Sequence, residues 1–145
     1  MDEKYYLKLD GNLDERTIKQ NVLKLSKDLN YANSKFIRPY EKKYWEDAAK
    51  VLEARGYPII KDVILDVFEW MKDMNWPGAL IAYDILKKLP EDILVENLET
   101  SIQKAISTND IGWLYWLNLF LEDGIVDEKK ISNSSLLLAI KNSEG

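Results

Sequence analysis

Four prolines divide the central part of this chain of 145 residues into segments of helical length: Pro39, Pro58, Pro77 and Pro90. Proline is favoured at the first position of an α-helix, because the N–H that it lacks would have no intrahelical acceptor there. The residue before a proline is driven toward extended backbone, which suits the position that caps a helix. The prolines therefore predict four helix starts.

Apolar residues recur at helical spacing after three of these prolines. Intervals of three and four residues mark the buried face of an amphipathic helix. The stripes are Ile59, Ile60, Val63, Ile64, Val67, Phe68 and Met71 after Pro58; Leu80, Ile81, Ile85, Leu86 and Leu89 after Pro77; and Leu94, Leu98, Ile102, Ala105 and Ile106 after Pro90. Acids at 91 and 92 also suit a first helical turn.

Further helices are expected near both ends of the chain. Asn12 and Glu15 resemble a capping box that opens a helix to about Asn30. The remaining expected caps and stops are Gly56 and Gly124 as helix ends, Asn109 or Asp110 as the cap of a helix to about Glu122, and Ser132 or Asn133 as the cap of the last helix. A weak strand is expected at residues 5–9 and a polar linker around 30–38.

These segments predict an all-α fold of about seven helices. Pro58 and Pro90 lie 32 residues apart, and the helix starts near 77 and 110 are similarly separated, a period typical of two-helix repeats. We expect antiparallel helix pairs stacked as a short HEAT/ARM-like right-handed α-α superhelix. A single domain is expected over residues 1–145, with a helical extension at 1–38, a repeat-like core at 39–123 and a capping helix at 124–145.

The composition argues against catalysis. The chain has no cysteine and no histidine, which removes thiolate chemistry, the commonest general base and the commonest transition-metal ligand. No nucleophile elbow, phosphate loop or calcium loop occurs. We expect no catalytic residue, no metal site, no cofactor and no enzymatic activity.

The charge pattern bears on partners and location. The net charge is −5, and the basic residues are scattered among acids, so no nucleic-acid partner is expected. The start of the chain is acidic where a signal peptide is basic, and the apolar stretch 111–121 is too short to span a bilayer. We expect a cytoplasmic protein without a membrane partner.

The stretch "EWMKDMNWPGAL" at 69–80 concentrates unusual residues between two expected helices. Asp73 and Asn75 fit two interpretations: they cap the helix after Pro77, which is the commoner role, or they bind a ligand. Small residues at 78 and 79 fit a close helix–helix approach better than an anion site.

The chain has five tryptophans, and their role stays open. Trp70, Trp76, Trp113 and Trp116 suit core packing between helices, which is the favoured role, and they also fit a partner or groove surface, where aromatic residues are enriched. Trp113 and Trp116 lie on a segment that is apolar nearly all round, which favours the core.

The residues "WMKDMNWPGA" and "NDIGWLYWL" resemble a family of short bacterial HEAT-like helical proteins of unknown function. The shared patterns are a W-x-x-D-x-N-W-P motif and a later acidic turn with W-x-x-W, here Trp70, Asp73, Asn75, Trp76 and Pro77, then Asp110, Trp113 and Trp116. The resemblance covers about 42–123 and leaves 1–40 outside. It implies a helical fold and supplies no activity.

Two carboxylate pairs at helical spacing, Asp62 with Asp66 and Asp92 with Glu96, are of a type that can hold a divalent ion, although solvated helix faces are the commoner reading. An enzyme built on such carboxylates is the least favoured function.

The first hypothesis is a protein-interaction module, in one form an immunity or inhibitor protein that binds a basic partner. The alternative is a small-ligand binder that uses a tryptophan-lined groove near Trp76 and Trp113. The candidate binding residues are Asp73, Asn75, Trp76, Asp110, Trp113 and Trp116. Self-association through exposed ends of the stack and the oligomeric state stay open.

Overall fold

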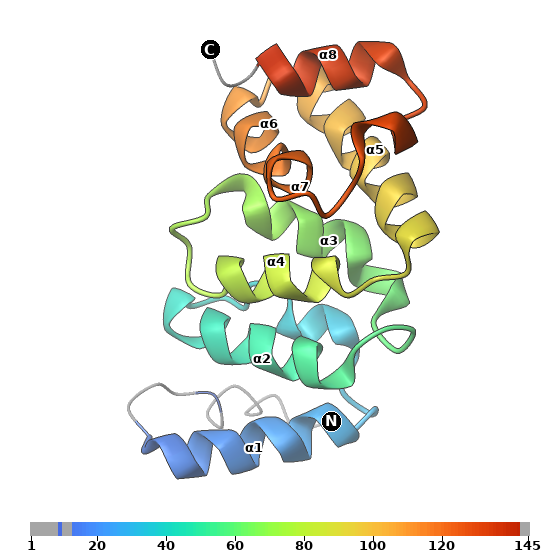
Figure 1. Cartoon of the computed structure of the whole chain (residues 1–145). Helices are drawn as coiled ribbons and strands as arrows, with labels where there is room; N and C mark the ends of the chain where they lie inside the picture. The colour runs from blue at the N-terminus through green and yellow to red at the C-terminus, as the bar shows by residue number, and fades with distance from the viewer. Residues whose placement is uncertain (1–8, 10–12, 143–145) are drawn as a thin grey trace.

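The computed structural model describes residue 9 and residues 13–142, and this part of the chain is all helical (Figure 1). The α-helices are α1 (Glu15–Lys27), α2 (Trp45–Arg55), α3 (Ile64–Glu69), α4 (Ala79–Lys87), α5 (Glu91–Ser107), α6 (Ile111–Leu117), α7 (Leu119–Glu122) and α8 (Ser134–Asn142). The 3-10 helices are η2 (Asn33–Phe36), η3 (Lys42–Tyr44), η4 (Lys61–Val63), η5 (Trp70–Lys72) and η6 (Glu128–Lys130). Asn118 ends α6 and caps α7, so these two form one bent helix and the expected total of about seven is confirmed. No strand occurs among the described residues; the strand expected at 5–9 lies outside them except for Leu9, which is fully buried.

The helices are stacked along one axis from α1 to α8 (Figure 1). α1 packs on α2, α2 on α4, α3 on α4 and α5, and α5 on α6 and α8. The buried apolar side chains form one cluster that extends from Leu9 and Val22 at one end to Leu136 and Ile140 at the other. None of the helices in the described part is long and apolar enough to cross a membrane.

Two of the four prolines lie close to the helix starts that they predict. α5 begins at Glu91 directly after Pro90, whose carbonyl accepts from the Leu94 N–H at 2.9 Å. α4 begins two residues after Pro77, because Trp76 to Ala79 first form a turn. The prediction of acids in the first turn of α5 is confirmed.

The helix starts predicted at Pro39 and Pro58 are wrong. Pro39 lies six residues before α2, and its carbonyl accepts from the indole N–H of Trp45 at 2.6 Å, which holds the segment outside the helix. After Pro58 the chain makes turns and η4 before α3 starts. Here the Ile59 carbonyl accepts from the Asn33 side chain at 2.9 Å, so an acceptor that a helix would use is bound elsewhere.

The helix expected to run from 58 to 71 is reduced to the six residues of α3. α3 ends at Glu69, one residue after Phe68. The Phe68 carbonyl accepts a hydrogen bond from the indole N–H of Trp113 at 3.1 Å. A distant side chain therefore binds the acceptor that the next α-helical turn needs.

The expected caps and stops are correct at four sites and wrong at one. Gly124 follows the end of α7 with a φ of 72°, as expected of a helix stop. Asp110 caps α6 by accepting from the Trp113 N–H at 3.0 Å, Asn133 caps α8 by accepting from the Ser135 N–H at 2.9 Å, and Gly56 ends α2. α1 is capped by Asp14, which accepts from the Thr17 N–H at 2.8 Å, rather than by Asn12, which lies outside the described residues. α1 also ends at Lys27, short of Asn30.

The linker expected at 30–38 instead carries core residues and a buried polar network. Phe36 is fully buried, and Asn33 accepts from the buried Arg55 guanidinium at 2.8 Å. Arg55 also donates to the carbonyls of Leu25 and Asp28 at 3.1 and 3.0 Å. The Arg55 side chain of α2 thus binds backbone carbonyls at the end of α1 and the Asn33 side chain of η2. The sequence did not predict this role for Arg55.

Candidate functional site

Trp70 and Gly78 hold the two ends of the loop between α3 and α4. Trp70 is fully buried, and its indole N–H donates to the Pro77 carbonyl at 2.9 Å. Gly78 has a φ of 86°, and a Cβ there would lie 2.8 Å from Trp70 Cζ2 and 3.0 Å from the Trp45 carbonyl oxygen. Only glycine combines this left-handed backbone with so close an approach.

The loop consists of two consecutive turns. The Trp76 N–H donates to the Asp73 carbonyl at 3.0 Å, and the Ala79 N–H donates to the Trp76 carbonyl at 3.1 Å. In the second turn the proline and the glycine at 78 occupy the central positions of a type II turn, with φ 86° and ψ −10° at the glycine. A Pro-Gly pair in a sequence is typical of such a turn, so Pro77 and Gly78 could have predicted it.

Asp73 stabilises the first turn instead of capping α4, so that expected role is corrected. Its carboxylate accepts from the Asn75 N–H at 2.8 Å, while α4 has no side-chain cap at all. Asn75 itself is exposed, and no hydrogen bond of its side chain is found in the described part. The local fold therefore explains Asp73 and leaves the Asn75 amide group free to make contacts outside this loop.

Trp76 is half-buried and belongs to a surface cluster at the amino end of α2. Its ring meets that of Trp45 edge-on, with centroids 5.6 Å apart. The Arg38 guanidinium lies 5.6 Å from the Trp76 ring centroid, and the Lys42 ammonium lies 5.6 Å from that of Trp45. Tyr40, between these cations in sequence, is fully exposed. We call Arg38, Tyr40, Lys42, Trp45 and Trp76 the tryptophan face.

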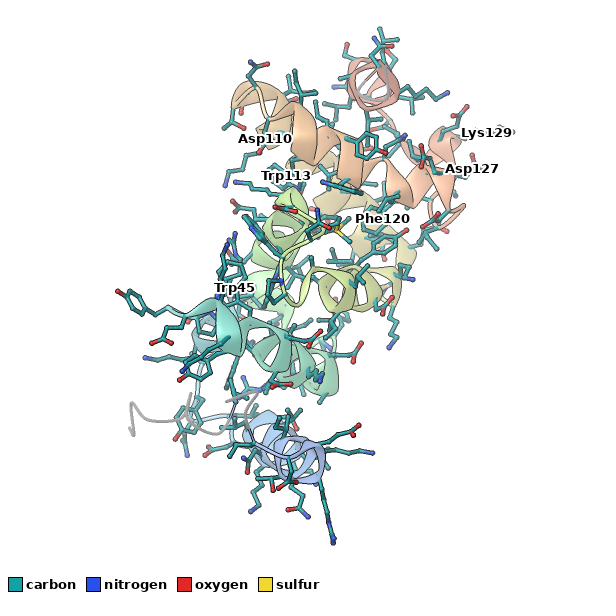
Figure 2. The ribbon with its side chains drawn as sticks, turned by 90° about the vertical axis from the view of Figure 1, so that its left-hand side faces the viewer. Trp45, Asp110, Trp113, Phe120, Asp127 and Lys129 are labelled. Carbon is teal, nitrogen blue, oxygen red and sulfur yellow. The ribbon has the colours of Figure 1, made fainter. Side chains whose placement is uncertain are left out.

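The second motif, Asp110 with Trp113 and Trp116, contributes mainly to packing and capping within the fold. Trp113 is 1% exposed, and Asp110 is engaged as the cap of α6. Trp116 is half-buried and packs edge-on against the exposed Tyr115, with ring centroids 4.9 Å apart. Figure 2 places Asp110 and Trp113 above Trp45 along the stack.

A partly exposed charged cluster connects the two motifs. Glu69 binds Lys72 at 3.0 Å and Lys104 at 3.1 Å, and the Lys72 ammonium lies 4.9 Å from the ring centroid of Trp113. Burial by itself raises the pKa of the Glu69 carboxyl, but hydrogen bonds and charge from the two lysines outweigh it and hold that pKa below its ordinary value. The cluster joins α3, η5, α5 and α6.

The six candidate binding residues are therefore divided between two roles. Asp73, Asp110 and Trp113 are engaged within the fold, whereas Asn75, Trp76 and Trp116 keep exposed atoms. Trp76 contacts Trp45, and Trp116 contacts Tyr115, so the exposed tryptophans have separate aromatic neighbours.

An acidic groove of about 450 Å³ lies along the first half of α5, on the side of the stack opposite the amino ends of α2 and α4 (Figure 1). Its lining residues are Glu91, Asp92, Val95, Glu96, Glu99, Lys130 and Ser132. Glu91 forms a 3.4 Å ion pair with Lys130, and Glu99 accepts from the Ser132 N–H at 2.8 Å. Asp92 and Glu96 have no cation or hydrogen-bond donor for their carboxylates in the described part of the chain.

Asp62, considered above with Asp66 as a possible metal ligand, instead takes part in a hydrogen-bond network. Asp62 accepts from the Asn33 amide at 2.6 Å, so one of its oxygens belongs to the Arg55 network. No group of three or more acidic side chains within residues 13–142 is placed to hold a metal ion.

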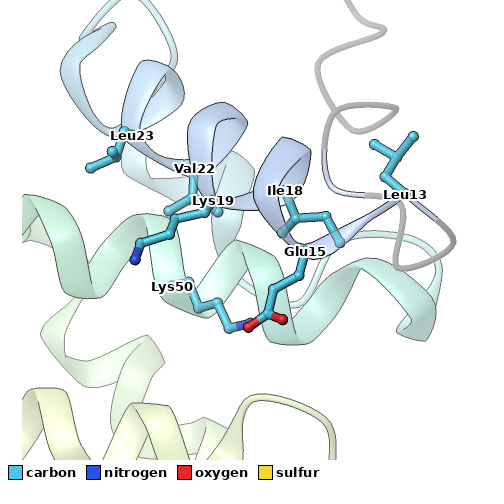
Figure 3. A pocket seen from close by; sticks show the side chains of 7 residues that line it. All are labelled: Leu13, Glu15, Ile18, Lys19, Val22, Leu23 and Lys50. Atoms are coloured by element: carbon cyan, nitrogen blue, oxygen red, sulfur yellow. The ribbon is translucent and has the colours of Figure 1, made fainter.

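A second groove, of about 540 Å³, lies between α1 and α2 (Figure 3). The side chains that line it are mostly aliphatic, with three charged ones among them: Leu13, Glu15, Ile18, Lys19, Val22, Leu23 and Lys50. Tyr83, in α4, lies outside these grooves and donates its hydroxyl to the Asp123 carboxylate at 2.6 Å. Burial and the negative charge of Asp123 raise the pKa of the Tyr83 hydroxyl.

Comparison with known proteins identifies the family. The model of a family described as Domain of unknown function (DUF5071) matches residues 39–143, and the chain belongs to this family. No curated protein and no solved structure matches the chain. The family match begins six residues before α2 and includes the loop, the tryptophan face from Tyr40 onward and the acidic groove.

Proposed function

We propose that this member of the DUF5071 family is a non-enzymatic protein-interaction module that binds a basic segment of another protein in the acidic groove of α5. The observation that carries this proposal is the pair of uncompensated carboxylates of Asp92 and Glu96. Like charges four residues apart on a helix are destabilising by a few tenths of a kcal/mol. A basic partner would remove that repulsion.

Three further properties support the proposal. The overall charge of −5 accelerates encounter with a basic partner and disfavours acidic ones. Val95 supplies an apolar contact in the groove, and Glu91 is exposed and held only by the exposed Lys130. A surface ion pair of this kind contributes little, so a partner's arginine exchanges with Lys130 at small cost.

The experiment is a titration of a labelled Arg- and Lys-rich peptide into the chain at low and at physiological salt. The double variant Asp92→Asn/Glu96→Gln should weaken binding about 2-fold to 30-fold, because two exposed ion pairs contribute about 0.2–1 kcal/mol each. The matched control is Glu41→Gln/Glu46→Gln, which changes the net charge equally at exposed positions outside the groove. Equal losses in both double variants would show that only net charge matters, and the proposal would be refuted.

The immunity or inhibitor form of the proposal adds that the partner is a basic toxin or enzyme whose active surface is covered. Activity of such a partner, measured with the wild-type chain and with the groove variant, tests this form. Inhibition that is unchanged in the groove variant would count against it.

The finer description of the fold as a HEAT-like right-handed superhelix is part of the proposal. In its support, α3 and α4 pack against each other, as do α5 and α6, and each pair is consecutive in the chain. A crystal structure tests the description, since one rotation and translation should relate successive pairs. The small-ligand alternative is not retained, because Trp113 is 1% exposed and cannot line an open groove with Trp76.

A further inference from the structure

The tryptophan face differs in charge from the rest of this acidic chain. Two of its five residues, Arg38 and Lys42, are cations and none is acidic, although the exposed Glu41 and Glu46 flank it in sequence. Neither cation forms an ion pair in the described part of the chain, whereas lysines such as Lys72, Lys104 and Lys130 do. The nearest acid in sequence, Glu41, is bound to Lys43 at 3.5 Å.

The face also has hydrogen-bond donors that the fold does not use. The Nε of Arg38 is buried and has no acceptor. The indole N–H groups of Trp45, Trp70 and Trp113 each donate to a backbone carbonyl, whereas no acceptor is found for that of Trp76 in the described part. The Arg38 Nε is too buried to meet a partner, so the donors that the face presents are the terminal guanidinium nitrogens of Arg38, the Lys42 ammonium and the Trp76 indole N–H.

The backbone beneath the face is held in place. Arg38 has a φ of 38°, a left-handed conformation that is unfavourable for a residue with a side chain. The following residue is fixed by the Trp45 indole, which donates to the Pro39 carbonyl at 2.6 Å. This arrangement keeps the Arg38 guanidinium over Trp76 and leaves Tyr40 fully exposed. A surface that is already ordered loses less entropy when it binds.

We propose that the tryptophan face binds an acidic segment of a partner protein, with carboxylates placed between Arg38 and Lys42 and an apolar side chain against Tyr40. Guanidinium and ammonium groups form their strongest hydrogen bonds with carboxylates. Tyr, Trp and Arg are also the residues that dominate binding energy at protein interfaces. A protein segment fits better than a nucleic acid, because a long phosphate backbone would meet the chain's net charge of −5 beyond the two cations.

This surface is independent of the acidic groove. The groove lies along α5 on the opposite side of the stack from the amino end of α2, where Trp45 is located (Figures 1 and 2). The two sites take segments of opposite charge, so the failure of one proposal leaves the other intact.

The test uses the full chain and a synthetic peptide of alternating Glu and Phe, with a Gln and Phe peptide as its uncharged counterpart. Binding is followed by calorimetry and by tryptophan fluorescence. The double variant Tyr40→Ala/Lys42→Gln should weaken binding of the acidic peptide about tenfold or more. Both side chains are exposed, so the fold should be retained. The matched control is Tyr115→Ala/Lys61→Gln, which removes an exposed tyrosine and an exposed lysine elsewhere and should leave binding unchanged.

Each other outcome has a definite meaning. Absent binding of the acidic peptide, equal binding of the uncharged peptide, or an equal loss in the control variant would overturn the proposal. Tighter binding of a single-stranded oligonucleotide through the same two residues would overturn it in favour of a nucleic acid. Sedimentation that shows dimers lost in Tyr40→Ala/Lys42→Gln would identify a second copy of the chain as the occupant instead. Unchanged acidic-peptide binding in Asp92→Asn/Glu96→Gln would confirm that the two sites are separate.

Discussion

Substitution of Gly78 by alanine should destabilise the protein far more than the same change at other glycines. Two effects add at this position. An alanine in left-handed backbone costs about 1–2 kcal/mol, and Gly78 has a φ of 86°. The new Cβ would also lie 2.8 Å from Trp70 Cζ2 and 3.0 Å from the Trp45 carbonyl oxygen, so a fully buried ring or the first turn of α2 must shift. Overpacking of this kind costs about 1–3 kcal/mol.

The expected loss for Gly78→Ala is therefore about 2–5 kcal/mol, which lowers Tm by about 5–15 °C in a chain of this size. Two other glycines provide matched references. Gly124 has a φ of 72° and nothing within 4 Å of an added Cβ, so Gly124→Ala should cost only the backbone part, about 1–2 kcal/mol. Gly112 is helical, and its Cβ would meet only an Asp110 oxygen at 3.8 Å, so Gly112→Ala should stabilise by about 0.5–1 kcal/mol.

Urea denaturation of the three variants, followed by circular dichroism, measures these differences. The difference between Gly78→Ala and Gly124→Ala isolates the steric contribution of Trp70 and Trp45. Equal losses in these two variants would show that the loop relaxes around the added methyl group, and the reasoning about the close approach would be refuted.

Three further predictions concern polar groups. Arg55→Met should lower the free energy of unfolding by about 1–3 kcal/mol in urea denaturation, because it leaves the buried Asn33 side-chain oxygen without a donor and removes a second donor from the Leu25 and Asp28 carbonyls. Asp110→Ala should cost about 1 kcal/mol by the same measurement, whereas Asp110→Asn should be nearly neutral, because asparagine caps helices equally well. The pKa of Glu69 is held below its ordinary value of 4.5, so its ionised form stabilises the fold above that pH and the contribution disappears as the pH falls through the lowered pKa. In an NMR titration, Lys72→Met/Lys104→Met should raise the pKa of Glu69, since both hydrogen-bonded cations are removed.

Each of these predictions has an outcome that contradicts it. An Arg55→Met variant as stable as the exposed-site variant Arg16→Met would mean that water satisfies the abandoned acceptors. Equal losses in the two Asp110 variants would assign the effect to charge rather than to capping. An unchanged Glu69 pKa in the double lysine variant would mean that the lysines do not bind this carboxylate in solution.

The sequence predicted features that depend on neighbouring residues. The caps at Asp110 and Asn133, the stop at Gly56 and the acids at the start of α5 each involve partners within four residues. Apolar periodicity also predicted the all-α class correctly. Such local signals are visible in a single sequence because the interacting residues have a fixed spacing.

The errors arise where distant side chains bind backbone groups. Asn33 reaches the Ile59 carbonyl across 26 positions, and Trp113 reaches that of Phe68 across 45. No periodicity encodes these hydrogen bonds, so the helix predicted after Pro58 was too long. For the candidate site, the tryptophans were recognised as unusual, but only their neighbours divide them into buried Trp70 and Trp113 and partly exposed Trp45, Trp76 and Trp116.

The Arg55 network has a consequence for where this family's domain can be cut. The family match starts at Pro39, yet the acceptors of the Arg55 guanidinium belong to Leu25, Asp28 and Asn33. A truncated chain that begins at Pro39 would lack all three acceptors of the Arg55 guanidinium and would expose the side of α2 that α1 covers. The segment that the family model matches therefore lacks the residues that accept hydrogen bonds from Arg55 in this fold. Relatives without an equivalent of the first 38 residues should carry a different residue where Arg55 stands.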